Sequence, residues 1–565
     1  MKTRGCRWAA LGGLIGMVAA TAGGAAIATD RALLVLRTSE TRAFASWRML
    51  GTDGPGARYE VETAERAAGP WRPVTGGQPT GTNCVVPVPG GATPLVRVKV
   101  TRPGRPDEVT PAAAVPARPE PWVRLPLATG DRAQKVGLGD FDGDGRLDYL
   151  VKTPDFNTDP YQQPGYWKKS TDTYKLTAYR HDGTRLWTYD MGWSIEEGIW
   201  YSPVVVCDLD GDGRAEVFCK AGEGDPREPT GHVRTGPEWL VMLDGRTGEV
   251  RRRLPWPSRD GFDDYNYSSR NLLGVAYLDG KRPHLLVVRG TYRIIKVQAY
   301  TPELRPLWYW EASGPDASYR GQVMHGLHAV DVDGDGRDEI ILGSAALDDD
   351  GKPLWNTRKG HPDICYVADF DPARPGLEIF YGLEKGQPRG GVALHDARTG
   401  AEIWGNPEKT VHVHGQGMVG DIIPEEPGIE CYAGESKGGT GWWLYTAAGK
   451  LIHRQDLGEL SPKAVYWLEG ATKIYVVGRK LYRWPREEIG ELSSGRTVAI
   501  ADFLGDWREE IVVAADGELR IYSSTVPTNL RRPWLMEDRL YRNDVTVQTM
   551  GYFYPPQLST ALVQP

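Results

Sequence analysis

Short apolar runs alternate with turn-forming segments along most of the chain. Between residues 31 and 118 the runs include 33–36, 59–62 and 96–100, and Gly, Pro and Asp residues separate them. About seven such strands within this stretch predict a small β-sandwich. The Pro-rich stretch 111–121 then predicts a semi-rigid linker.

From residue 122 to the C-terminus one arrangement of strands recurs. An apolar strand leads into an Asp-rich loop and then into a second apolar strand, as at 339–343. A third strand and a turn are followed by a returning strand that carries a Trp, as at Trp187, Trp308 and Trp404. Roughly eight units of about four strands predict an all-β fold with an eight-bladed β-propeller at 122–565.

Three long insertions interrupt these units, at 155–172, 222–237 and 260–270. Loops that decorate one rim of a scaffold commonly carry function, so the insertions are expected to lie together around the functional site. The sequence contains no convincing long amphipathic helix.

The Asp-rich loops are the clearest local motif. Each full copy has carboxylates at alternating positions, two glycines, and an acid eight residues after the first Asp. The three full copies contain Asp140, Asp142, Asp144 and Asp148; Asp208, Asp210, Asp212 and Glu216; and Asp331, Asp333, Asp335 and Glu339. Such an oxygen cage suits a hard cation, and several Ca²⁺ ions are expected.

An EF-hand is excluded for these loops. That motif needs a bidentate Glu at its twelfth position, where this chain has Val151, Cys219 and Leu342, and strands rather than helices flank the loops. Incomplete copies of the motif begin at Asp369, Asp421 and Asp502. Two segments with weaker similarity to it begin at residues 275 and 464. We expect a Ca²⁺ ion bound in each loop to stabilise the hairpin that contains it, and we do not expect the loops to catalyse a reaction.

Composition narrows the class of protein. A hydrophobic content of 40% excludes wholesale disorder, and a net charge of -7 without a basic cluster argues against nucleic acid as a partner. The chain has 20 Trp but only 9 Phe. Most of these Trp are expected to pack in the blade cores, while some could stack on sugar rings in a wet groove.

The N-terminus predicts an export signal at residues 1–28. Basic residues precede an apolar stretch, and Ala26-Ile27-Ala28 is a small-x-small cleavage site. No second apolar stretch of spanning length follows, so a secreted, extracellular or periplasmic monomer without a membrane anchor is expected. Five cysteines lie beyond the signal, and a bridge between Cys207 and Cys219 is possible.

Two histidine clusters carry candidate chemistry. His325 and His328 precede the third full loop, His361 and Asp363 follow, and Glu384 comes after the next strand. Two imidazoles and two carboxylates from adjacent blades would bind a metal ion, whereas each histidine taken alone could be a hydrogen-bonded core residue.

The second cluster is His412-Val413-His414-Gly415-Gln416. Alternation along a strand would place His412, His414 and Gln416 on one face. Imidazoles are natural general bases near neutral pH, although structural histidines are an equal alternative here.

The chain resembles the family 11 polysaccharide lyases, the bacterial rhamnogalacturonan endolyases. The segments that carry the resemblance are 45–53, 275–283, 374–378 and 501–510, the last being Ala-Asp-Phe-Leu-Gly-Asp-Trp-Arg-Glu-Glu. The resemblance implies a fibronectin-III-like domain at 31–118 before an eight-bladed, Ca²⁺-rich propeller. It also implies cleavage of an acidic pectic polysaccharide by β-elimination at a uronate.

The resemblance assigns site residues by position. A functional Ca²⁺ would be held by His325, His361, Asp363 and Glu384, and Tyr552 would bind substrate. The family's catalytic Arg position is occupied here by Gln416, and the Asn-Gly-Thr phrase before its catalytic Lys is missing, so that only Arg496 could substitute nearby.

The departures at the catalytic positions define a mechanistic hypothesis. His412 or His414 would supply the base, with Arg496 and Tyr552 in charge neutralisation or proton donation, and Gln416, Tyr552 and Arg496 would contact substrate. Two further functions remain open. One is a lyase acting on another rhamnosyl-uronate linkage, and the other is a non-catalytic Ca²⁺-propeller that binds glycans or proteins.

Overall fold

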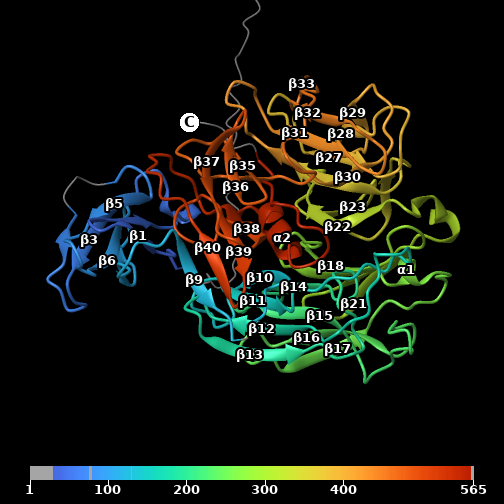
Figure 1. Cartoon of the computed structure of the whole chain (residues 1–565), viewed down its shortest axis with the longest axis horizontal. Coiled ribbons are helices and arrows are strands. Elements are labelled where there is room, and N and C mark those ends of the chain that lie inside the picture. Colours follow the sequence, from blue (N-terminus) through green and yellow to red (C-terminus); the bar gives the residue numbers. More distant parts are fainter. Residues whose placement is uncertain (1–29, 75–78, 129, 561–565) are drawn as a thin grey trace, which may run out of the picture.

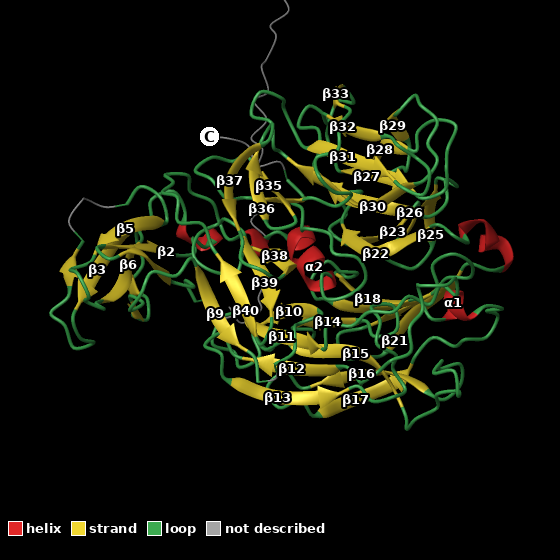
Figure 2. Ribbon diagram, viewed as in Figure 1, coloured by secondary structure: helices red, strands yellow, loops and turns green. Residues whose placement is uncertain are grey.

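The computed structural model describes residues 30–74, 79–128 and 130–560. Over these residues the chain is all-β, with ten sheets and two short α-helices, as Figure 2 shows. Three 3₁₀ helices add to them: η1 (Gly51–Asp53), η2 (Gly314–Tyr319) and η3 (Leu535–Glu537). The predicted export signal at 1–28 lies outside the described residues.

The N-terminal region is a β-sandwich, as the sequence predicts. One sheet holds β1 (Leu34–Ser39), β2 (Arg42–Ser46) and β5 (Asn83–Pro87). The other holds β4 (Arg72–Pro73), β3 (Arg58–Ala64), β6 (Leu95–Thr101) and β7 (Glu108–Val109), with β8 (Ala113–Ala114) also paired to β6. Inward-facing side chains of both sheets, such as Ala45 and Val98, form one buried core. Such alternation is what a sheet with one wet face requires.

The predicted linker is only partly a linker. β8 lies inside 111–121, where Ala113 and Ala114 pair with Val96 and Leu95. Prolines flank this strand without occupying it, so two residues of the stretch join the sheet edge.

Eight four-stranded antiparallel sheets follow, each a meander except the last. The first four sheets are β10 (Lys135–Gly139), β11 (Asp148–Thr153), β12 (Lys175–Tyr179) and β13 (Arg185–Asp190); β14 (Val204–Cys207), β15 (Glu216–Gly222), β16 (Glu238–Leu243) and β17 (Val250–Pro255); β18 (Asn271–Ala276), β19 (His284–Arg289), β20 (Lys296–Tyr300) and β21 (Pro306–Glu311); and β22 (Val323–Val330), β23 (Glu339–Gly343), β24 (Ala345–Leu347) and β25 (Pro353–Asn356).

The remaining four sheets continue in chain order. They are β26 (Pro362–Ala368), β27 (Glu378–Leu383), β28 (Val392–Asp396) and β29 (Glu402–Gly405); β30 (Val413–Gly420), β31 (Glu430–Glu435), β32 (Trp442–Tyr445) and β33 (Leu451–His453); β34 (Lys463–Val465), β35 (Ile474–Val477), β36 (Lys480–Arg483) and β37 (Glu487–Glu491); and β38 (Arg496–Ala501), β39 (Glu510–Ala515) and β40 (Glu518–Tyr522) with β9 (Trp122–Pro126).

The sheets form a closed ring. The first strand of each sheet contacts the first strand of the next from β10 to β34, and β38 returns to β10. Shared buried clusters join the seventh sheet to the eighth and the eighth to the first. β9, from the start of the repeat region, is the outer strand of the last sheet, so strands from both chain ends complete one sheet. Figure 1 shows the sandwich standing beside β9 and β40.

Tryptophans on the fourth strands of four sheets bond each of these sheets to the next one. The indole N–H of Trp187 donates to the carbonyl of Gly245, and Trp404 donates to Ala447, both in the last turn of the following sheet. Trp308 and Trp355 make the same contact with Asp349 and Ala397. These four Trp therefore serve packing between sheets, and each satisfies the indole donor that burial would otherwise strand.

The Asp-rich loops occupy one position in every sheet that has them. Each loop connects the first strand to the second, and its last acid is the first residue of the second strand, as with Glu216 of β15 and Glu339 of β23. That acid accepts a hydrogen bond from a backbone N–H inside its own loop, from Leu209 and Val332 respectively. The loops therefore lie at the end of the innermost strands.

Two sheets lack the motif and borrow an acid instead. In the third sheet the N–H of Tyr277 donates to Asp338, which belongs to the fourth sheet. In the seventh sheet the N–H of Tyr466 donates to Glu509 of the eighth. An acid of the next sheet thus replaces the missing acid of the same loop, which keeps the buried backbone donor satisfied.

One helix fills the centre of the ring, and the sequence analysis did not predict it. α2 (Arg539–Val547) contacts β10, β14, β18 and β22, and Figure 1 shows it inside the ring of sheets. Its Asn543 and Tyr541 bond the two borrowed acids, Asp338 and Glu509. The helix has nine residues and the other, α1 (Tyr265–Ser268), has four, so neither gives a long periodic signal.

The disulfide bond that the sequence left possible between Cys207 and Cys219 is absent. Cys207 and Cys219 are both free thiols, because they lie at opposite ends of the paired strands β14 and β15. Among the described residues, no helix has the length and apolar character needed to cross a membrane.

Candidate active site

A cavity of about 280 Å³ lies at the start of the innermost strands, opposite the Asp-rich loops. Strands β22, β26 and β30 contribute His325, Asp363 and His414 to its lining. The insertions at 155–172 and 260–270 supply further lining residues, which confirms that they gather on one rim. Repeated strands thus bring polar groups to the same end of the ring.

The predicted metal ligands meet at this cavity: His325, Asp363 and Glu384 line it, and His361 lies directly beside them. The Nε2 atoms of His325 and His361 are 3.2 Å apart, and Oδ1 of Asp363 lies 3.4 Å and 3.2 Å from them. Oε2 of Glu384 lies 3.9 Å from Nε2 of His361. The four side chains that the resemblance selected therefore converge on one point.

The donor atoms suit a divalent cation. Nδ1 of His361 is hydrogen-bonded to the carbonyl of Val323, which leaves its Nε2 as the atom with the free lone pair. Burial lowers the pKa of His325 well below its usual range and the neighbouring His361 adds to the effect, so this imidazole is neutral. Two imidazole nitrogens facing each other beside carboxylate oxygens form a donor set that could hold a cation.

The second histidine cluster joins the same group. Nδ1 of His414 lies 2.5 Å from Oδ2 of Asp363, and Nε2 of His412 lies 3.8 Å from Oε1 of Glu384. The two imidazole rings are 5.1 Å apart. Both clusters that the sequence treats separately are therefore one constellation around Asp363 and Glu384.

Asp363 is the centre of this constellation. Burial alone would raise the pKa of its carboxyl, but the neighbouring imidazoles of His361 and His414 hold that pKa well below its usual range. The carboxylate therefore stays charged at any working pH. It accepts the Nδ1 proton of His414, so that the Nε2 of this imidazole is the basic atom.

The predicted alternation fails after His414. β30 begins at Val413, and its pairing with β31 shifts register between His414 and Met418, where Gly415 and Gly417 both have positive φ. The backbone N–H of Gln416 donates to Ser461 of the seventh sheet, and Gln416 is not among the lining residues of the cavity. A bulge moves side chains off the regular two-residue period.

His328 has a separate, structural place. Its Nδ1 lies 2.7 Å from Asp544 of α2 and its Nε2 lies 3.0 Å from the carbonyl of Cys365. It is therefore a hydrogen-bonded core residue that anchors the central helix.

Tyr552 lies where the resemblance implies. Its backbone N–H donates to the carbonyl of His325, and its ring lies 4.5 Å from the His325 ring and 5.6 Å from that of Trp200. Burial raises the pKa of its phenol well above the usual value, so the hydroxyl is protonated. The group can therefore donate a proton or a hydrogen bond inside the cavity.

Arg496 lies elsewhere than the other predicted catalytic side chains. Its Nη2 donates to Asp155 and to the carbonyls of Ala133 and Gln134, and it is not among the lining residues. It contacts the base of the 155–172 insertion rather than the cavity.

Sequence reasoning missed several lining residues. Arg270, Asp159, Tyr292 and Lys437 all line the cavity. The hydroxyl of Tyr292 lies 3.3 Å from Nε2 of His325. Arg270 and Asp159 belong to insertions that the sequence marked as functional, but nothing in the repeat pattern distinguishes them from their neighbours.

One buried acid ties the rim loops together. Glu196 accepts hydrogen bonds from Tyr265, from the indole of Trp167 and from the backbone of Val233. These partners come from all three predicted insertions, so a single carboxylate fixes their mutual positions.

The Asp-rich loops have the geometry of cation sites. One oxygen from each of three acids in every full loop lies within 4.8 Å of the others. In the third loop Oε1 of Glu339 is buried without a partner among the described residues. Burial raises the pKa of Glu216 and of Glu339 to about 8. Carboxyls in such a state are ready to exchange a proton for a metal ion.

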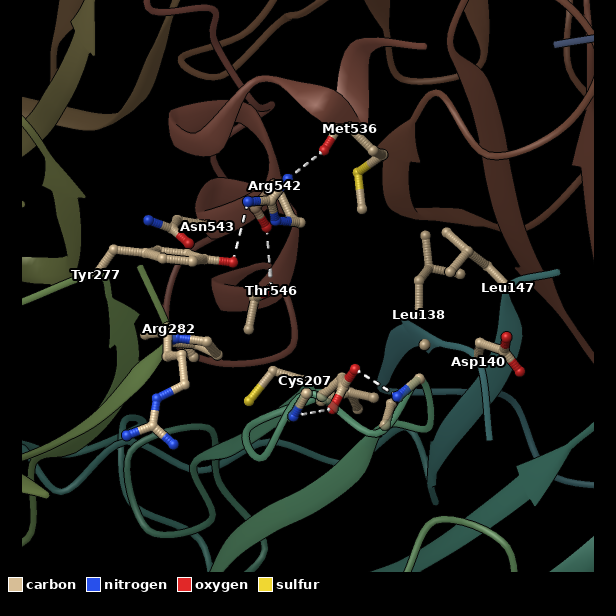
Figure 3. A pocket seen from close by; sticks show the side chains of 18 of the residues that line it. Leu138, Asp140, Leu147, Cys207, Tyr277, Arg282, Met536, Arg542, Asn543 and Thr546 are labelled. Carbon is tan, nitrogen blue, oxygen red and sulfur yellow. Dashed lines mark hydrogen bonds between the residues drawn. The ribbon is translucent and has the colours of Figure 1, made fainter. Parts of the chain in front are cut away.

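A larger cavity, of about 650 Å³, lies at the other end of the innermost strands beside α2. Figure 3 shows Leu138 and Leu147 across from Met536, with Arg542 bonded to the carbonyl of Met536 and to the hydroxyl of Tyr277. It holds no histidine, and its polar groups mostly bond one another. The smaller cavity, lined by His325, Asp363 and His414, is therefore the better candidate for the active site.

Comparison with known proteins shows the family to which the chain belongs. The family model described as "Rhamnogalacturonan lyase family 11, C-terminal domain" matches residues 128–564. Rhamnogalacturonan endolyase YesW of Bacillus subtilis (strain 168) is 33% identical, covering 94% of this chain and 90% of that protein. Rhamnogalacturonan exolyase YesX of the same strain is 32% identical, covering 94% of each.

A solved structure of a rhamnogalacturonan lyase is similar to this chain over almost its whole length. The Bacillus licheniformis rhamnogalacturonan lyase superposes with a TM-score of 0.85 at 30% identity, covering 95% of this chain and 97% of that one.

Proposed function

The chain belongs to rhamnogalacturonan lyase family 11, and from that premise we propose that it cleaves a rhamnogalacturonan-type pectic polysaccharide by β-elimination at a uronate. The observation that carries this proposal is the cluster that His325, His361, Asp363, Glu384 and His414 form at the wall of one cavity.

The reaction needs three things from the protein. The C5 hydrogen of a uronate is weakly acidic beside an ionised carboxylate, so that charge must be neutralised. A base must then remove the proton, and an acid can assist departure of the O4-linked sugar. The C5–H and C4–O4 bonds break and a π bond forms between C4 and C5. The base keeps the C5 proton, and O4 leaves with the electron pair of the C4–O4 bond and takes a proton from the acid.

This chain's residues fit those tasks. His414 has its Nδ1 committed to Asp363, which leaves Nε2 to accept the C5 proton. Tyr552 holds a protonated phenol in the same cavity and would donate to the leaving oxygen. His412 lies beside Glu384 and would assist His414 as the base.

A Ca²⁺ ion is proposed at His325, His361, Asp363 and Glu384. When bound, it supplies positive charge that disperses the charge developing on the uronate carboxylate. Further Ca²⁺ ions are proposed in the three full Asp-rich loops, where they would hold each hairpin closed.

The finer architecture belongs to the same proposal. We infer that the eight sheets are the blades of a propeller and that the sandwich is fibronectin-III-like, supported by the closed ring and the shared core. We also infer export from the cell, on the basis of the signal at 1–28.

A second candidate function is elimination at another rhamnosyl-uronate linkage. It is favoured by Gln416, which stands at the family's catalytic Arg position and does not line the cavity.

One assay tests both candidates and the non-catalytic alternative. The protein is incubated with rhamnogalacturonan, homogalacturonan and glucuronate-bearing polymers, with and without chelator, and the absorbance of unsaturated ends is followed. Product from rhamnogalacturonan alone supports the first candidate, and product only from another polymer supports the second. No product from any polymer, with the protein folded and metal-loaded, overturns both.

A further inference from the structure

Arg270 is a buried cation in the wall of the active-site cavity. It is only 3% exposed, yet it lines the cavity with His325, Asp363 and Tyr552. A guanidinium so deeply buried needs partners for its charge and its donors. Its contacts show how much of that need the protein meets.

Two polar partners hold the guanidinium from one side. Nε donates to the side-chain oxygen of Asn266 at 3.0 Å, and Nη2 donates to Oδ1 of Asp159 at 2.8 Å. Asp159 also accepts from the indole of Trp200, at 2.8 Å, and from the backbone of Tyr161. The only acid within ion-pair distance of Arg270 in the described chain is therefore itself shared among three donors.

Two aromatic rings fix the plane of the group. The guanidinium carbon lies 5.0 Å from the ring centre of Trp200 and 5.0 Å from that of Tyr292. Tyr292 in turn contacts His325, and Trp200 contacts both His325 and Tyr552. The rings that orient Arg270 are thus the rings that surround the proposed reaction centre.

The remaining amino group of Arg270 has no hydrogen-bond partner in the part of the chain that the structure describes. Nη1 donates to none of the described residues, and it is not among the buried polar atoms cut off from solvent. Because Arg270 lines the cavity, this amino group is accessible from it. A preorganised guanidinium with one amino group left open is suited to binding a carboxylate.

The other cations near the site are less suited to this task. Lys437 lines the cavity but is exposed and belongs to the turn between β31 and β32. Arg496 is bonded to Asp155 and two carbonyls outside the cavity. Preorganised charge in a desolvated site stabilises a developing anion more than a mobile surface charge does.

We propose that Arg270 binds the substrate's uronate carboxylate and neutralises its charge during elimination. The assignment rests on the proposed function, because it presumes a uronate in the cavity. The mechanistic hypothesis drawn from the sequence assigns charge neutralisation to Arg496. In the present proposal that role belongs to Arg270, at the end of the 260–270 insertion.

The test separates ligand binding from loop support. Metal-loaded wild-type protein is titrated with a rhamnogalacturonan oligosaccharide and with the same oligosaccharide after carboxyl reduction. Wild type should prefer the acidic form, and Arg270→Ala should lose that preference. Its kcat/KM should fall on the order of 10²–10³-fold, and added guanidinium ion should restore part of the activity.

Two variants control for structure. Asp159→Asn removes the acid partner but keeps the guanidinium, so the preference for the acidic oligosaccharide should persist. If Arg270 served only to hold the loop, Asp159→Asn would damage binding as much as Arg270→Ala. Arg253 lies on the outer strand β17, where it pairs with Glu223 and stacks on Trp239 of β16. Arg253→Ala should therefore behave as wild type.

The outcomes distinguish the two proposals. If wild type neither cleaves nor binds any uronate-bearing polymer, the proposed function fails. If wild type cleaves but Arg270→Ala keeps the full preference for the acidic oligosaccharide, the assignment of Arg270 alone is overturned.

Discussion

His414 and Asp363 are joined side chain to side chain, with 2.5 Å between Nδ1 and Oδ2, while Oδ1 of the same carboxylate faces His361 and His325. One buried acid would therefore serve both the proposed cation site and the proposed base. The carboxylate sets the tautomer of His414 and stabilises the imidazolium that would form when Nε2 takes a proton.

We predict that His414→Ala lowers kcat on the order of 10²–10⁴-fold, the usual contribution of a general base. His412→Ala should have a smaller effect, because its Nε2 lies 3.8 Å from Glu384 and has no partner that fixes its tautomer. The rate of absorbance increase from unsaturated product measures both. Unchanged rates in both variants would remove the histidines from the mechanism.

The two kinds of cation site should separate by mutation. Asp333→Ala, in an Asp-rich loop remote from the cavity, should lower the melting temperature in Ca²⁺ and leave kcat near wild type. Glu384→Gln should abolish most activity with little change in melting temperature, because Glu384 lies at the cavity rather than in a hairpin loop. Elemental analysis should find one bound ion fewer in each variant, and equal effects of the two variants on stability would contradict this division.

Chelated protein should lose stability as pH rises. In the folded, metal-free chain burial raises the pKa of Glu216 to about 8, whereas an unfolded Glu has a pKa of about 4.3. Between these values the folded state holds more protons than the unfolded state, so the free energy of unfolding falls from about pH 4 to pH 8.

Calorimetry in chelator at pH 5, 6, 7 and 8 measures this slope. Glu216→Gln should make the slope less steep, because the neutral amide does not titrate whereas Glu339 still does. Saturating Ca²⁺ should raise the melting temperature most at pH 8, where the fewest protons compete with the ion. A melting temperature that rises with pH in chelator would refute the prediction.

Asp338 should be a large contributor to the stability of the ring. It is fully buried, accepts from the backbone of Tyr277 in the neighbouring sheet, and pairs with Arg539 and Asn543 of α2. Asp338→Ala removes the acceptor of the Tyr277 backbone N–H and the ion pair with Arg539, and it should cost about 2–4 kcal/mol of unfolding free energy.

A surface pair provides the control for this variant. Glu303 pairs with Arg282 at the exposed turn of the third sheet. Glu303→Ala should change stability by less than about 0.5 kcal/mol in denaturant titrations. A similar loss in both variants would mean that the bond between sheets is no stronger than an exposed ion pair.

Local rules explain what could be predicted. The two-residue period of β1 to β6, the first-to-second-strand position of the Asp-rich loops and the Trp of the fourth strands follow from nearest-neighbour chemistry. The same rules failed at Gln416, where two glycines in the left-handed region introduce a bulge that the period does not anticipate.

The sequence alone determined the repeat, its strands, its candidate cation loops and the four ligands that the resemblance selected. Only the tertiary structure decided that His414 joins Asp363, that Arg270 lies in the wall of the cavity, and that α2 and the acids of neighbouring sheets hold the ring closed. The physical reason is distance along the chain. Residues 51 and 201 positions apart meet in these contacts, and closure of the ring, rather than any local preference, brings them together.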